Sequence, residues 1–162
     1  MRDTGAVTHF QIRPIAAAVV EDARQRLGAG DPAVARVIVE TPLSSPCRRC
    51  LRDGAPGEAM LLFGFSPFTH VGPYVDSGPV FAHEAPCMPQ AFAPDTVPDM
   101  TAARAQVLVR VYDHRHWIHD AKLVSGADAA AALKDFFADE TVAYAHVRSA
   151  TYQCFAYSVD RA

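Results

Sequence analysis

Lysine is scarce in this sequence: Lys122 and Lys134 are the only two, and the remaining basic residues are arginines. The formal net charge at pH 7 is -3, so the chain carries no general excess of positive charge. Proteins that bind nucleic acids or acidic membranes through unspecific electrostatics need such an excess. The composition therefore predicts neither a nucleic-acid partner nor a membrane surface.

Long apolar runs are also missing. The run Ile15–Val20 follows Pro14 and stops at Glu21, so it is too short to span a bilayer and lacks the flanks of a signal peptide. We therefore expect a cytoplasmic protein. Because thiols stay reduced there, the four cysteines are expected to be free, metal-bound or redox-active, not paired in structural disulfides.

Several short functional signatures are absent as well. The sequence contains no G-x-G-x-x-G, no Walker-type phosphate loop and no H-E-x-x-H, and it has no internal repeat or low-complexity tract. A Ser-His-Asp arrangement cannot be derived from one sequence, because such triads form in space and not along the chain. The sequence therefore names no reaction.

The segments that are present indicate an α+β fold. A chain of 162 residues, half of them apolar, is long enough for a single compact domain over residues 1–162. Alternating or β-branched segments predict short strands in a mainly antiparallel sheet, with two to three helices. The strands are expected at 8–15, 34–40, 59–65, 79–83, 105–113, 117–125, 142–150 and 154–161, and helices at 16–30 and 125–140.

Details of two segments sharpen this prediction. Gly28 is expected to end the first helix, and Ser125 to cap the helix that buries Leu133, Phe136 and Phe137. Between residues 84 and 100 four prolines predict a long irregular connection, a kind of segment that is often functional or disordered.

The segment SPCRRCLRDGAPGE holds a C-x2-C pair in front of a turn-forming tail. Cys47 and Cys50 form this pair, and His83 and Cys87 form an H-x3-C pair at the end of a predicted strand. Three thiols and one imidazole are the ligand set of a closed tetrahedral zinc site. The sequence therefore predicts a structural zinc site, while the alternative is that Cys47 and Cys50 are small buried apolar side chains.

A thiol oxidoreductase is the second interpretation of the same pair. Arg48, Arg49 and Arg52 place positive charge near Cys47, which would lower its pKa. A thioredoxin-like motif, however, stands at the start of a helix, whereas a turn and a strand follow here. The arginines themselves have two interpretations, an anion site or an ordinary solvated surface. Cys154, in a predicted strand, is expected to be a core thiol.

Strand alternation points to a second candidate site. In the segment 106–112, Arg110 lies on the face opposite three valines, and in 143–149 His146 and Arg148 lie on one face. If the two strands are neighbours, these groups converge on a carboxylate or phosphate, and Tyr74 of the preceding loop could close over them. The alternative is an ordinary polar outer face of the sheet. His114, His116 and His119 cluster by a predicted hairpin, where an exposed turn explains them better than a metal.

Several phrases together resemble one family. They are PCRRCLRDGAPGE, MLLFGFSPF, PYVDSGPVFAH, VRVYD and VAYAHVRSATYQCF, in this order. The chain resembles the bacterial family catalogued as domain of unknown function 1203, from about Val39 to Arg161. The resemblance implies no activity.

Three functions therefore stay open. The first is binding of a small anionic molecule or a protein partner by a domain with a structural zinc. The second is an enzyme that acts on a small anionic substrate, with His146 as acid or base and Arg110 and Arg148 as clamps. The third is a thiol oxidoreductase that uses Cys47 and Cys50.

Overall fold

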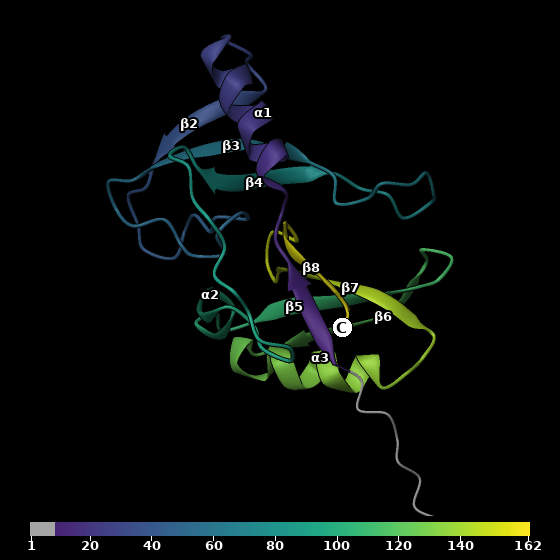
Figure 1. Ribbon diagram of the computed structural model, residues 1–162. Helices are drawn as coiled ribbons and strands as arrows, with labels where there is room; N and C mark the ends of the chain where they lie inside the picture. The colour runs from purple at the N-terminus through teal and green to yellow at the C-terminus, as the bar shows by residue number, and fades with distance from the viewer. Residues whose placement is uncertain (1–8) are drawn as a thin grey trace, which may run out of the picture.

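The computed structural model describes residues 9–162 and confirms the α+β class (Figure 1). Its helices are α1 (Ala17–Gly28), α2 (Asp99–Ala102) and α3 (Ala129–Phe137), the last preceded by a 3-10 turn, Gly126–Asp128. Its strands are β1 (Phe10–Arg13), β2 (Val34–Ile38), β3 (Ala59–Phe65), β4 (Gly78–His83), β5 (Val107–Asp113), β6 (Ile118–Val124), β7 (Val142–Ser149) and β8 (Phe155–Arg161).

The strands form two antiparallel sheets and not a single one. The larger sheet has the order β1-β8-β7-β5-β6, and the smaller one has the order β2-β3-β4. Every pairing in both sheets is antiparallel, as the sequence predicted. Figure 1 shows the small sheet beneath α1 and the large sheet above α3, with the chain of β1 running from one to the other.

Helix α3 covers one face of the large sheet. Leu133 and Phe137 are fully buried and Phe136 is 8% exposed, so the predicted apolar stripe is confirmed. Phe137 stacks on Phe10 of β1 with ring centroids 6.3 Å apart. The Ser125 hydroxyl oxygen accepts a hydrogen bond from the Asp128 amide, which caps the helix start.

Helix α1 covers the small sheet and builds a second core. Val20 and Ala23 pack with Val34, Met60 and the other buried side chains of β2, β3 and β4. The helix includes Gly28, and the left-handed residue that turns the chain is Gly30 (φ 77°). The helix therefore ends at Gly28, as predicted, and Gly30 turns the chain because glycine adopts this conformation without a Cβ clash.

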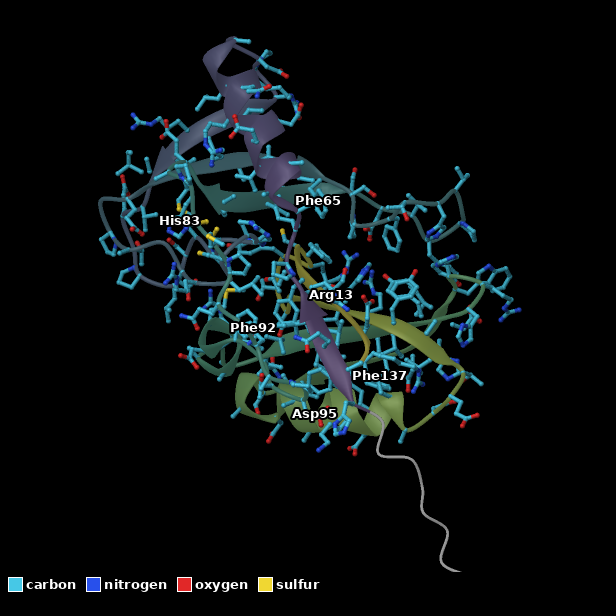
Figure 2. The ribbon with its side chains drawn as sticks, viewed as in Figure 1. Arg13, Phe65, His83, Phe92, Asp95 and Phe137 are labelled. Atoms are coloured by element: carbon cyan, nitrogen blue, oxygen red, sulfur yellow. The ribbon has the colours of Figure 1, made fainter. Side chains whose placement is uncertain are left out.

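The irregular connection between β4 and α2 packs along the edge strand β1. Gln11 Nε2 donates to the Phe92 carbonyl and the Phe10 amide donates to the Asp95 carboxylate, both at 3.0 Å. Figure 2 shows Phe92 and Asp95 beside this strand. Among the described residues, no helix is both long and apolar enough to cross a membrane.

Candidate functional site

The C-x2-C segment folds into a tight turn held by the main chain. The Cys47 amide donates to the Arg52 carbonyl and the Leu51 amide donates to the Cys47 carbonyl, both at 2.9 Å. Leu51 takes a left-handed conformation (φ 60°), which closes the turn and leaves both sulfurs on the inner side. The Arg48 amide donates to the Phe81 carbonyl at 2.9 Å and so fastens the turn to β4.

Strand β4 brings the second pair to the same place. It ends at His83, and Cys87 follows in the connection. The three sulfurs and one ring nitrogen of Cys47, Cys50, His83 and Cys87 all lie within 4.8 Å of one another. Cys47 Sγ is 3.7 Å from Cys87 Sγ, and Cys50 Sγ is 3.4 Å from His83 Nδ1. Figure 2 shows the sulfur atoms gathered beside His83. The arrangement is compatible with binding of a metal ion, and the convergence of the four predicted residues is confirmed.

The thiols of this Cys3His cluster differ in acidity. A hydrogen bond from the Cys47 thiol, together with contact to His83, lowers the pKa of Cys50. The same bond and burial raise the pKa of Cys47, and burial raises the pKa of Cys87. The redox interpretation requires an acidic Cys47, and the complete burial of this thiol works against it.

A second layer of groups surrounds the cluster. His83 Nε2 lies 3.2 Å from the Glu58 carboxylate, so the ring is held between this carboxylate and the sulfurs. Interaction with Cys50 raises the pKa of His83. The amides of Cys50 and His83 donate to Cys47 Sγ at 3.5 and 3.3 Å. Such outer contacts orient ligands and balance thiolate charge in metal sites.

The second predicted set, Arg110, His146 and Arg148, also comes together in the structure. Strands β5 and β7 are neighbours, with Arg110 directly opposite His146 and Leu108 opposite Arg148. The Asp76 carboxylate contacts both guanidinium groups: it accepts a hydrogen bond from Arg148 at 3.0 Å and lies 3.6 Å from Arg110. The two arginines therefore already hold a carboxylate, one supplied by the chain itself.

This face of the large sheet is buried and not an open polar surface. His146 is 1% exposed and Arg148 4%. The rings of Phe68, Tyr112 and Phe155 surround the His146 ring at centroid distances of 5.0, 4.9 and 5.1 Å. Burial, with the charges of Arg148 and Arg110, lowers the pKa of His146 to about 3. Arg148 is therefore part of the buried packing of this face.

The loop between β3 and β4 covers this face, but with other residues than predicted. Phe68 packs on His146, and Asp76 bridges the arginines. Tyr74 contacts Trp117 of the hairpin turn edge-on, with ring centroids 6.2 Å apart. A cavity of about 310 Å³ remains beside Asp76, Arg110 and Arg148.

The predictions for the three histidines by the hairpin and for Cys154 have different outcomes. His114, His116 and His119 each have a separate partner, namely the Glu140 carbonyl, the Tyr144 hydroxyl and the Asp139 carboxylate. Cys154 is not a core thiol: it precedes β8 in the turn that follows β7, and it is only partly buried.

Sequence reasoning missed Glu58, Phe68 and Asp76. All three lie in turns or loops, where no periodicity marks the direction of a side chain. The segment PYVDSG places Asp76 in a loop, but nothing in its sequence indicates which side chain Asp76 contacts. Arg48 was expected at the surface, yet it is 4% exposed.

Comparison with known proteins identifies a family. The family model described as "Protein of unknown function (DUF1203)" matches residues 44–161. No curated protein and no solved structure matches the chain. The matched region contains both the cysteine and histidine cluster and the arginines on the large sheet.

Proposed function

Since the chain belongs to the DUF1203 family, whose description assigns no activity, we propose its function from its own Cys3His cluster: the protein binds one zinc ion that fastens the Ser45–Glu58 turn to β4. The observation that carries this proposal is that four donor atoms from two chain segments lie within 4.8 Å of one another. Cys47 and Cys87 are 40 positions apart in the sequence, and their sulfur atoms lie 3.7 Å apart.

The donor set favours zinc in a structural role. Thiolate and imidazole are the ligands that zinc prefers, whereas calcium and magnesium prefer oxygen. Cys47 and Cys50 are fully buried, and a site with four protein ligands leaves no open position for a substrate. Catalytic zinc sites keep such a position.

The surroundings of the cluster fit the charge of a zinc complex. Three thiolates and a neutral imidazole around Zn²⁺ leave one negative charge. Arg52 is within hydrogen-bonding reach of Cys50, and this interaction raises the pKa of Arg52. The arginine-rich turn thus supplies the counter-charge for the complex, which gives Arg52 a role other than a solvated surface residue.

Metal analysis of purified untagged protein tests the proposal. We expect close to one zinc per chain and loss of this zinc in Cys50→Ser. Cys154→Ser is the matched control, because Cys154 lies outside the cluster, and this variant should keep its metal. Protein that neither carries zinc nor takes it up under reducing conditions would contradict the proposal. A disulfide between Cys47 and Cys50 in the isolated protein would favour the oxidoreductase.

We also propose that the arginines on the large sheet bind a small anion when Asp76 leaves them. The supporting observation is that Arg110 and Arg148 share a carboxylate in the folded chain. Asp76 is 43% exposed, so an external anion has a path to the same position. The burial of His146 and its neutral ring favour binding over acid–base catalysis here.

Asp76→Asn tests this second role. The substitution should destabilise the protein by about 1–3 kcal/mol, because it leaves a buried guanidinium without its charged acceptor. Millimolar phosphate should then raise the melting temperature of the variant more than that of the unchanged protein. Asp160→Asn, which removes the exposed partner of Arg13, is the control and should show no such response. Equal responses in all three proteins would contradict the role.

A further inference from the structure

A groove lies between the two sheets, apart from both candidate sites described above. Its volume is about 640 Å³, within the range of small-molecule pockets. Side chains from the small sheet, from the segment before the C-x2-C turn and from the turn between β7 and β8 line it. None of the four residues of the Cys3His cluster and neither arginine of the Asp76 pair is among them. We call it the inter-sheet groove.

Arg48 lines this groove with a guanidinium whose direct partners are backbone carbonyls. Its Nε donates to the Phe155 carbonyl at 2.8 Å and its Nη1 to the Pro46 carbonyl at 2.7 Å, both neutral acceptors. Among residues 9–162, no carboxylate forms an ion pair with Arg48, and its Nη2 has no hydrogen-bond partner. The side chain is 4% exposed. Burial lowers the pKa of Arg48 to about 10, so the guanidinium is still charged at neutral pH.

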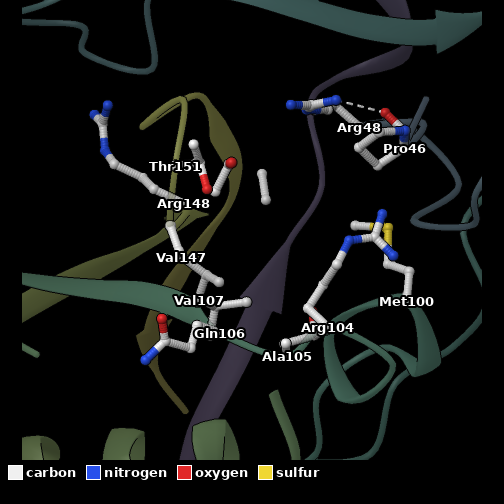
Figure 3. Close-up of a pocket in the computed structure, with 14 residues that line it drawn as sticks. Pro46, Arg48, Met100, Arg104, Ala105, Gln106, Val107, Val147, Arg148 and Thr151 are labelled. Carbon is white, nitrogen blue, oxygen red and sulfur yellow. Dashed lines mark hydrogen bonds between the residues drawn. The ribbon is translucent and has the colours of Figure 1, made fainter. Parts of the chain in front are cut away.

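The other arginines nearby are already paired. Arg104, which also lines the groove, is held by the Asp53 carboxylate. Figure 3 shows a smaller adjoining cavity of about 300 Å³ that shares Arg48 and Arg104, with the guanidinium of Arg148 turned away from both. Arg148 is paired with Asp76. Arg48 is therefore the arginine of this groove that no carboxylate among the described residues contacts directly, and burial of a charge without a direct partner is costly.

The remaining walls of the groove are mostly apolar. Leu62 and Phe81 of the small sheet form one side, and Leu43 and Tyr152 stand near the mouth, where they are 52% and 83% exposed. Exposed apolar side chains beside a concave surface mark binding sites more often than isolated ones do. The Ser149 residue of β7 adds a hydroxyl to the lining.

We propose that the inter-sheet groove binds a small organic monocarboxylate, with the carboxylate on Arg48 and the apolar part of the ligand between Phe81, Leu62 and Tyr152. A single guanidinium without a carboxylate partner matches a single negative charge. A free Nη2 donor suits a carboxylate oxygen, since charge-assisted bonds of this kind are the stronger ones. The apolar walls match a hydrocarbon body and not a second charged group.

The test uses three probes on the purified protein as isolated, followed by NMR of the backbone amides. 2-Naphthoate carries the proposed charge and body, 2-naphthamide has the same shape without charge, and inorganic phosphate has charge without an apolar body. We expect naphthoate to shift the amides of residues 43–48 and 149–154 in a saturable way. Naphthamide should bind at least tenfold more weakly, and phosphate should not saturate these shifts.

A pair of matched variants locates the site. Leu43→Glu adds a negative charge at the mouth and should weaken naphthoate binding at least tenfold. Leu123→Glu adds the same charge to an equally exposed leucine (57%) on β6, outside the groove, and should bind naphthoate as the unchanged protein does. Both variants leave Arg48 and its packing intact.

Three results would overturn the proposal. They are equal affinity for naphthoate and naphthamide, equal affinity in the Leu43→Glu and Leu123→Glu variants, and naphthoate shifts that map to Arg110 and Asp76 instead of the groove. None of them depends on whether the cysteine cluster holds zinc, so the failure of this inference and the failure of the zinc proposal are distinguishable.

Discussion

Glu58 has no ligand atom in the Cys3His cluster, yet it is predicted to control the affinity of the cluster for zinc. Its carboxylate holds Nε2 of His83 and so fixes the ring orientation with Nδ1 towards the sulfurs. Loss of such an outer contact typically lowers metal affinity 10- to 100-fold. We expect a decrease of about this size for Glu58→Gln, measured by competition with a chelator of known affinity.

Glu84→Gln is the control for this measurement. Glu84 follows His83 directly, but its carboxylate pairs with Arg36 on the surface. The variant removes the same charge at nearly the same place and should keep the affinity of the unchanged protein. A similar loss in both variants would show that the effect is general electrostatics and not orientation of the ring.

His146 is predicted to make the stability of the protein depend on pH. Its pKa is about 3 in the folded protein, against 6.5 for an unperturbed histidine. The unfolded chain therefore binds this proton first, so the free energy of unfolding is highest above pH 6.5 and falls as the pH drops towards 3. Between pH 6.5 and 5.5 the loss from this residue is about 1 kcal/mol.

Urea denaturation at these two pH values measures the effect, with His146→Phe as the comparison. Phenylalanine keeps an aromatic ring among Phe68, Tyr112 and Phe155 but binds no proton. The variant should lose less stability over this interval than the unchanged protein. The same slope in both proteins would mean that the ring is accessible to protons in the folded state.

Helix α3 shows how far local pattern determines an element. Phe136 is 8% exposed under the large sheet, while Lys134 is about half exposed and only 3.7 Å from Asp95 at the surface. Phe136→Ala should cost about 3–5 kcal/mol of unfolding free energy. Lys134→Ala should cost less than 1 kcal/mol, because exposed ion pairs contribute little. Equal melting temperatures of the two variants would show that the face of α3 that carries Phe136 does not pack on the sheet.

The strands were predictable for the same reason that α3 was, but their partners were not. Alternation in β5 and β7 put Arg110, His146 and Arg148 on one face, since side-chain direction follows from the backbone period. That this face is buried depends on the loop that crosses it, and on Phe68 and Asp76 within that loop. Neither residue belongs to a periodic segment, so nothing local indicated its position.

The division of the strands into two sheets could not be predicted from the sequence either. Register and neighbours are set by contacts between distant segments, such as Arg48 with the Phe155 carbonyl, and local propensity carries no information about them. The Cys3His cluster was the exception. Its residues could be found because metal ligands are recognised by type and spacing, which the sequence contains directly.

For the whole molecule, the two cores predict a local response to metal removal. Cys47 and Cys50 pack in the core of the small sheet, whereas β5, β7 and α3 belong to the other core. A structural zinc contributes roughly 10 kcal/mol or more of binding free energy to the folded form of small sites. After chelation we expect faster hydrogen exchange in residues 45–58 and 78–87, with unchanged protection in β5, β7 and α3. Global loss of protection would show that the large sheet also depends on the metal.

The pairing of β1 with β8 has a consequence for how the molecule is made. Phe10 stands opposite Arg161 and Arg13 opposite Ser158, so the first described strand completes its sheet only with the last one. The β5–β6 and β7–β8 hairpins close between near neighbours, which is fast, but this pairing closes across most of the chain, which is slow. During synthesis Phe10 and Ile12, both buried in the folded protein, therefore lack their partner strand until β8 has been made. During this interval the new chain stays soluble only if its aggregation is slow or if a chaperone binds the exposed segment.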